Sequence, residues 1–240
     1  MDRVFHVKQS KLNKLVVVAI DGPTGVGKST LARKLADRWR FLYVDTGAMF
    51  RCLALKWKVL GHPEEDEALQ MLGDNTHIAF SAAGRVFCDE QEVSAEIRTE
   101  EISRLASRVS KFEVIREVMK QQQRQLVAET KMQQVYSGAV LEGRDIGTVV
   151  LPDATIKFFV DADPKIRAQR RTDQLLEHGQ HADYIEVFNA IQERDQQDQT
   201  RAIAPLKPAE DAVLVDTTQL TPEQVLEQMS DQIFNLAHSD

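Results

Sequence analysis

Cysteine is scarce in this chain: Cys52 and Cys88 are the only two among 240 residues. Two thiols are too few for a disulfide framework, and their separation does not match a metal-ligand motif. Repeats and long Gly/Ser-rich or Pro-rich linkers are also missing, so we expect one enzyme-sized unit. The simplest interpretation is two structural thiols in a protein of the reducing cytosol, which predicts a cytoplasmic location.

Long apolar runs are absent as well. No stretch approaches the roughly 20 residues needed to span a bilayer, and the start, MDRVFHVKQSKLNK, lacks the apolar core of a secretory signal. Basic charge is not in excess either, because the formal net charge is −7. Nucleic acids and acidic membranes are normally bound by basic surfaces. We therefore expect a soluble protein that binds neither, and in which local arginine clusters bind any phosphate.

A glycine-rich loop, GPTGVGKS, lies between a predicted strand, KLVVVAID, and a predicted helix, STLARKLADRW. It fits the G-x-x-x-x-G-K-[ST] pattern at every fixed position, in the strand–loop–helix context that this pattern requires. Its backbone N–H groups would hold the phosphates of a nucleoside triphosphate, Lys28 would reach the terminal phosphates, and Ser29 would bind Mg²⁺. The predicted triphosphate-binding residues are Gly22, Pro23, Thr24, Gly25, Val26, Gly27, Lys28, Ser29 and Thr30.

Four further apolar runs predict strands that are separated by helical segments. They are FLYVD, GAVLEG, TIKFFVDADP and DAVLVDTT, the last followed by the amphipathic segment TPEQVLEQMSDQIFNL. This alternation predicts an α/β fold: a parallel five-stranded sheet with helices on both faces. In such sheets ligands bind at the carboxyl ends of the strands. Each polar residue there could be a helix cap or a surface charge, but together they favour a site: Asp45, Thr46, Glu142, Arg144 and Asp145.

The first of two insertions covers about residues 61–130. Its short runs HIAFS, RVFCDE and QEVS predict a small antiparallel sheet, with Ala82-Ala83-Gly84 joining the first two. A helix is predicted from Thr99, its N-cap, to about Thr130. We interpret the glutamine-rich patch at Gln121–Gln123 as a solvated face of that helix.

The second insertion, about residues 181–201, carries little apolar surface and is a candidate for a mobile helical lid. Arg194 and Arg201 lie seven residues apart, two turns along one helical face, where both could point at phosphate. A solvated helix face is the alternative interpretation. The predicted core then comprises residues 15–60, 131–180 and 202–240, and residues 1–14 form an N-terminal extension.

From about Leu15 to Leu236 the sequence resembles the bacterial cytidylate kinases, which are P-loop nucleoside monophosphate kinases. The stretches that carry the resemblance are IDGPTGVGKSTLA, DTGAMFR, VSAEIRTEEIS, EGRDIGTVVLPDA, ERDQQDQTRAIAPL and LVDTT. The hairpin insertion before EIRT is the family's distinguishing extension of its monophosphate-binding domain. The resemblance implies a P-loop NTPase-type sheet and Mg²⁺-assisted, in-line transfer of a phosphoryl group from ATP to CMP or dCMP. It gives no evidence of an obligate protein partner.

The resemblance also implies roles for individual residues. Thr46 and Arg51 would hold the acceptor's α-phosphate, and Ser107, Arg116 and Asp145 would contact the cytosine ring. Arg144 would face phosphate. In the lid, Arg194 and Asp198 would approach the ribose and phosphate of the acceptor, and Arg201 would also bind phosphate. The residues implied to be catalytic are Lys28, Arg144, Arg194 and Arg201.

Five positions depart from the family pattern. Thr46 stands where the family usually has Ser, and Phe50 stands where it usually has Tyr. Glu142 stands where the family typically has Asp, and it could still hold a Mg²⁺-bound water. Gln197 and Gln199 occupy two positions that are often arginine in the family's lid. Two alternatives remain: a kinase for another monophosphate such as UMP or AMP, which would differ at Ser107, Arg116 and Asp145, and a non-catalytic P-loop regulatory protein.

Overall fold

The computed structural model describes residues 15–81, 84–133, 135–177, 179 and 181–237, so the predicted extension 1–14 and the turn residues Ala82 and Ala83 lie outside the described residues. Five parallel strands form the central sheet in the order β2-β6-β1-β7-β8, as predicted. The strands are β1 (Val16–Asp21), β2 (Phe41–Asp45), β6 (Gly138–Gly143), β7 (Ile156–Asp161) and β8 (Val213–Asp216).

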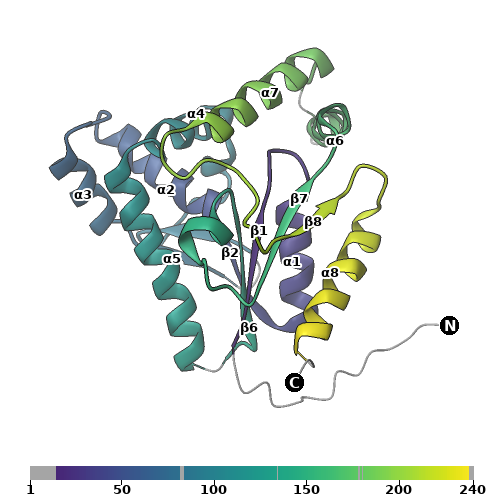
Figure 1. The fold of residues 1–240 in the computed structure, drawn as a ribbon. Helices are drawn as coiled ribbons and strands as arrows, with labels where there is room; N and C mark the ends of the chain where they lie inside the picture. Colours follow the sequence, from purple (N-terminus) through teal and green to yellow (C-terminus); the bar gives the residue numbers. More distant parts are fainter. Residues whose placement is uncertain (1–14, 82–83, 134, 178, 180, 238–240) are drawn as a thin grey trace.

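Helices cover both faces of this sheet (Figure 1). On one face α1 (Lys28–Trp39) packs with α8 (Pro222–Ala237), and on the other lie α2 (Thr46–Val59) and α5 (Glu113–Gln133). Successive residues of β1 point to opposite faces, since Val18 and Ile20 pack with α1 and α8 whereas Ala19 packs with α2. Burial on both faces explains why β1 reads as an unbroken apolar run.

The first insertion contains α3 (Asp66–Asp74) and a small antiparallel sheet in the order β3-β4-β5. Its strands are β3 (Ile78–Phe80), β4 (Val86–Cys88) and β5 (Gln91–Glu92), which confirms the predicted antiparallel sheet. A 3₁₀ turn, Glu96–Arg98, leads to α4 (Glu100–Val109). The predicted N-cap is confirmed, because Thr99 Oγ1 accepts a hydrogen bond from the Ile102 backbone N–H at 3.3 Å.

The prediction of one long helix from Thr99 to Thr130 is wrong. The chain forms two helices, α4 and α5, separated by residues 110–112. The helices have different packing partners, since α4 lies against α2 while α5 lies against α3 and the central sheet. Phe112 fixes the break by packing edge-on against Trp57, with ring centroids 6.0 Å apart.

The solvated face predicted for the glutamine patch is correct only in part. Gln121 is exposed, but Gln122 is half-buried and donates hydrogen bonds to the carbonyl oxygens of Gly73 and Thr76. Gln123 is 1% exposed. The patch therefore wraps around α5, and one of its residues lies inside the protein.

The second insertion forms α7 (Tyr184–Thr200), which packs beside α6 (Pro164–Glu177). Figure 1 shows α7 above the carboxyl ends of the strands. Arg201 lies just past the helix in an extended conformation (φ −62°, ψ 142°), so the prediction that it shares a helical face with Arg194 is wrong. Among the described residues, no helix has the length and apolar character to cross a membrane.

Candidate active site

The glycine loop joins β1 to α1, as predicted. Gly22 has φ +152°, and a Cβ atom there would lie 2.0 Å from the Val160 carbonyl oxygen, so only glycine fits. Gly27 adopts a left-handed conformation (φ 89°) as the N-cap of α1. Ser29 and Thr30 follow Lys28 in the exposed first turn of that helix. The loop thus presents a helix N-terminus, with its free N–H groups, at the carboxyl edge of the sheet.

Lys28 is a buried cation whose Nζ donates a hydrogen bond to the Pro23 carbonyl oxygen at 2.6 Å. The pKa of Lys28 is lowered from 10.5 to about 7. Burial is the largest cause, and repulsion from Arg144 is the second. A neutral carbonyl compensates little of the cost of burying this charge. The negative charge of an anionic ligand near Lys28 would oppose this shift by favouring the charged form.

Arg144, which follows β6, links three parts of the molecule. Its Nε donates to Asp198 Oδ2 on α7 at 2.8 Å, and its Nη2 donates to Thr24 Oγ1 in the glycine loop at 2.9 Å. The sequence prediction expected Asp198 near the ribose and phosphate of the acceptor. In the structure this carboxylate pairs with Arg144 and lies 3.9 Å from Arg201 Nη1.

Two further arginines complete a cluster of cations with Lys28 and Arg144. Burial, followed by repulsion from Arg144, lowers the pKa of Arg194 to about 10, and Arg51 also contributes to that repulsion. Arg51 Nη2 is 3.3 Å from Asp45 Oδ2, but its buried Nε has no hydrogen-bond partner among the described residues. Buried donors without acceptors are costly. The cluster therefore has the properties of a site for several phosphate groups.

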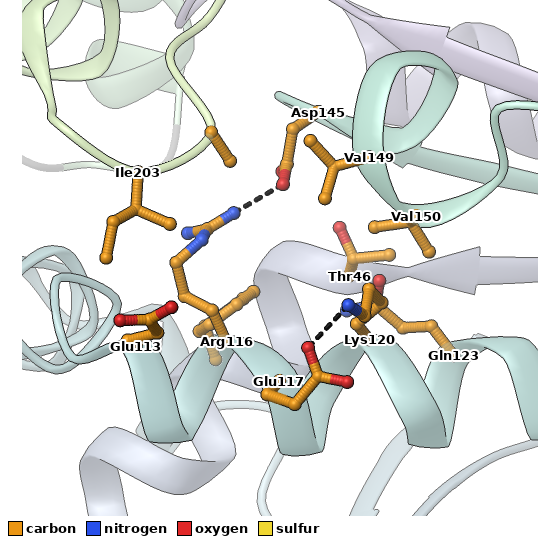
Figure 2. A pocket seen from close by; sticks show the side chains of 12 residues that line it. Thr46, Glu113, Arg116, Glu117, Lys120, Gln123, Asp145, Val149, Val150 and Ile203 are labelled. Atoms are coloured by element: carbon orange, nitrogen blue, oxygen red, sulfur yellow. Dashed lines mark hydrogen bonds and ion pairs between the residues drawn. The ribbon is translucent and has the colours of Figure 1, made fainter.

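A cavity of about 170 Å³ lies next to this cluster, between α5 and the turn that follows β6 (Figure 2). Within it, Arg116 Nη2 donates to Asp145 Oδ2 at 2.5 Å, and the Arg116 guanidinium lies over the Phe50 ring, 5.6 Å from its centroid. Arg201 Nη2 is 3.5 Å from Asp145 Oδ1. Thr46, whose Oγ1 donates to the Glu142 carbonyl oxygen at 2.6 Å, also lines the cavity.

Ser107 is the one predicted base-contacting residue that does not line this cavity. Its hydroxyl donates to Gln197 Oε1 on α7 at 3.4 Å. The structure thus brings Arg116 and Asp145 together and places Ser107 where α4 meets α7.

Ser29 and Glu142 have the oxygen donors that suit Mg²⁺, which prefers hard oxygen ligands and usually keeps several waters. Glu142 is buried at the end of β6, next to Ser29, which forms a hydrogen bond to it. Burial, followed by repulsion from Asp45, raises the pKa of Glu142, while Lys28 opposes this shift. A divalent cation near this carboxylate would favour its charged form, so the residues present fit the metal.

Comparison with known proteins decides the family. The family model described as cytidylate kinase matches residues 18–235. The chain belongs to the cytidylate kinase family. A protein named cytidylate kinase from Citrifermentans bemidjiense is 44% identical over 222 residues, which cover 91% of this chain and 92% of that protein. Proteins of the same name from Syntrophotalea carbinolica (44% identity, covering 91% of this chain and 92% of that protein) and Nitratidesulfovibrio vulgaris strain Hildenborough (45%, 86% and 87%) are similar to it as well.

Sequence reasoning missed three residues that shape the site of this cytidylate kinase family member. Asp195 is buried, accepts a hydrogen bond from the Thr24 backbone N–H at 3.2 Å, and pairs with Arg167 on α6. Arg167 also donates to the Thr24 carbonyl oxygen at 3.0 Å. Asp195 and Arg167 thereby fasten the glycine loop to α7. Asp195 stands inside the stretch ERDQQDQ, directly after Arg194, so its place beside a predicted phosphate-binding residue was the available signal.

Tyr43 is the third missed residue. Its hydroxyl donates to Glu142 Oε1 at 2.6 Å, across neighbouring strands β2 and β6. The longer side chain of glutamate at this position therefore has a defined partner. The sequence could not show it, because the pairing of two strands about a hundred residues apart is not a local pattern.

Proposed function

We propose that the protein transfers the γ-phosphoryl group of ATP to CMP and dCMP. ATP would bind at residues 22–30, the acceptor's phosphate would lie among Arg51, Arg144, Arg194 and Arg201, and its base would enter the cavity beside Arg116 and Asp145. The observation that carries this proposal is the arrangement of two adjoining sites: a phosphate loop with a cluster of mutually repelling cations, and a cavity lined by a carboxylate–guanidinium pair. Membership of the cytidylate kinase family supports it.

Phosphoryl transfer asks mainly for positioning and charge neutralisation. Lys28 and the loop N–H groups would hold the donor phosphates, and the four arginines would hold the acceptor phosphate in line with them. The acceptor phosphate is already an anion, so no general base is required. Mg²⁺ held by the Ser29 hydroxyl and, through water, by Glu142 would neutralise charge on the donor phosphates.

α7 would act as the lid, because it contacts both substrate regions. Asp195 reaches the glycine loop, Asp198 reaches Arg144, and Gln197 reaches Ser107. Closure over both substrates would exclude water and suppress hydrolysis of ATP.

A kinase for UMP or AMP is the first alternative. The base that the enzyme prefers distinguishes this alternative from a CMP kinase. Cytosine offers an exocyclic amino donor beside ring acceptors, whereas uracil presents a carbonyl where that amino group was. A carboxylate accepts up to about four hydrogen bonds, so Asp145 can accept from the base as well as from Arg116. With UMP, Asp145 would face a carbonyl oxygen, and its buried carboxylate would lose a donor.

We therefore predict that wild-type protein accepts CMP and dCMP and disfavours UMP by at least about 2 kcal/mol, roughly thirtyfold in kcat/KM. Asp145→Asn should erase most of this discrimination, because the amide can donate to the uracil carbonyl. Coupled ADP-release assays with Mg²⁺-ATP across the common nucleoside monophosphates measure it. Asp153→Asn, at an exposed position after the same strand, is the matched control.

The outcomes separate the alternatives. Equal rates with CMP and UMP, or an unchanged ratio in Asp145→Asn, would show that Asp145 does not read the base. ADP release without any stimulation by a monophosphate would favour a P-loop protein that only hydrolyses ATP.

A further inference from the structure

Three consecutive glutamines on α5 differ in their hydrogen bonding. Gln121 Nε2 donates to Glu117 Oε1 at 3.2 Å, and Gln122 Nε2 donates to two backbone carbonyl oxygens. Gln123 is the most buried of the three, at 1% exposure, yet its Oε1 has no hydrogen-bond partner among the described residues. Leaving a buried acceptor unpaired costs about 1–3 kcal/mol. Such an atom in a native site calls for a partner that is not part of the protein.

The Gln123 side chain lines the same cavity as Arg116 and Asp145. Residues 116 and 123 are two helical turns apart on α5, so they share a face of that helix. In Figure 2 the Arg116–Asp145 pair lies on one side of the cavity, and Gln123 lies on the other, beyond Thr46 and Lys120. A cavity of about 150 Å³ can hold a six-membered ring, so the 170 Å³ here suits a pyrimidine.

The neutral part of the acceptor is the partner that fits Gln123. The cations that would hold its phosphate are other residues, namely Arg51, Arg144, Arg194 and Arg201. Lys120, the cation nearest to Gln123 in Figure 2, is already paired with Glu117. A carboxamide, with one acceptor and one donor group, complements the polar edge of a base.

Accepting the proposed function, we propose that Gln123 hydrogen-bonds the base of the bound nucleoside monophosphate and contributes affinity without selecting between cytosine and uracil. No protein hydrogen bond fixes the Gln123 carbonyl oxygen. The carboxamide can therefore rotate by half a turn and offer its oxygen to an amino group or its nitrogen to a carbonyl. Affinity for the base then comes partly from Gln123, and selectivity comes from Asp145.

The test is Gln123→Met, which keeps the length and flexibility of the side chain and removes both polar atoms. We expect the dissociation constants of CMP and UMP, measured by isothermal titration, to rise by the same factor of about threefold to tenfold, the range for one neutral hydrogen bond. The KM for ATP should not change. Ribose 5-phosphate, which has the phosphate but no base, should bind wild type and variant equally. Gln121→Met, on the exposed side of α5, is the matched control and should bind CMP as the wild type does.

Other results would overturn the inference. Unchanged CMP binding in Gln123→Met would show that this side chain does not touch the base. Equal weakening of ribose 5-phosphate and CMP would show a general disturbance of the site. An altered CMP-to-UMP ratio would make Gln123 a selecting residue. If the wild type showed no CMP-stimulated ADP release, the proposed function would fail and this inference with it, a result distinct from failure in the variant alone.

Discussion

At the scale of single residues, Lys28 is the clearest case of a charge that is buried at a cost to the protein. Its folded pKa of about 7 lies below the unfolded value of 10.5, chiefly because it is buried. The unfolded chain therefore binds more protons than the folded chain between these pH values. The buried charge of Lys28 therefore lowers the stability of the ligand-free protein most at and below pH 7. This penalty shrinks as the pH rises toward 10.5.

We predict that Lys28→Met lowers kcat by at least about a hundredfold, because a charge that acts on the transferring phosphoryl group is lost. The ligand-free variant should nevertheless melt at a higher temperature than the wild type at pH 6.5. That advantage should narrow toward pH 9.5, by at most about 1.4 kcal/mol per pH unit. Thermal melts of both proteins at the two pH values measure it. A variant with normal turnover, or with an advantage that grows as the pH rises, would contradict this account.

At the scale of elements, α7 carries Arg194, Gln197 and Gln199 of the proposed lid. Gln197 lies one turn from Arg194 on the side of α7 that meets Ser107, whereas Gln199 lies five residues from Arg194, on the opposite side of the helix. Both side chains are exposed. The two glutamines therefore do not face the same surroundings, although both stand where the family often has arginine.

We predict that Gln197→Arg tightens CMP binding at low salt by up to about 1 kcal/mol, because it adds an exposed cation near the site. The gain should disappear at high ionic strength, and turnover should fall if the tighter lid slows product release. Gln199→Arg is the matched control, with the same charge on the opposite side of the helix. Titrations of CMP at two salt concentrations measure both variants. Equal gains from the two substitutions would mean that the orientation of α7 differs from the one described.

Elements with a local signal could be predicted, and those set by packing could not. The burial of β1 on both faces and the glycine loop follow directly from the sequence, as does the Thr99 cap. The break between α4 and α5 contains neither Gly nor Pro, so nothing local marks it. It arises because the helices pack on different neighbours.

The same division holds for the site. Lys28, Arg144 and Asp145 stand in recognisable motifs at strand ends, and the structure places them there. The Asp195–Arg167 pair joins α7 to α6, and the Tyr43–Glu142 bond joins β2 to β6. Neither pair follows from spacing along one element, because each forms only when the chain folds.

At the scale of the whole molecule, the ligands should act as part of the stabilising structure. The like charges of the cationic cluster repel one another. These charges come from four parts of the chain: the glycine loop, α2, the turn after β6, and α7. A ligand that carries phosphate would bind these parts together in the folded state alone.

We predict that CMP at about 100 times its dissociation constant stabilises the protein by about 2.7 kcal/mol, which raises Tm by roughly 5–10 °C for a chain of this size. Cytidine at the same concentration should have a much smaller effect, because it has no phosphate for the arginines. Differential scanning fluorimetry with each ligand measures this. Equal shifts from cytidine and CMP would show that the arginine cluster does not hold the acceptor's phosphate.

The strand order also bears on how the protein is made. β1 has β6 and β7 as neighbours, and β2 pairs with β6, so neither early strand pairs with the other. Val16 pairs with Gly138, which is synthesised about 120 residues later. At 5–20 residues per second this delay is roughly 6–24 s. During that interval the apolar segment VVVAI leaves the ribosome with its backbone edges unpaired. The central position that gives β1 a neighbour on each edge in the finished sheet thus leaves its edges unpaired for longer during synthesis than those of β2, whose partner is also β6.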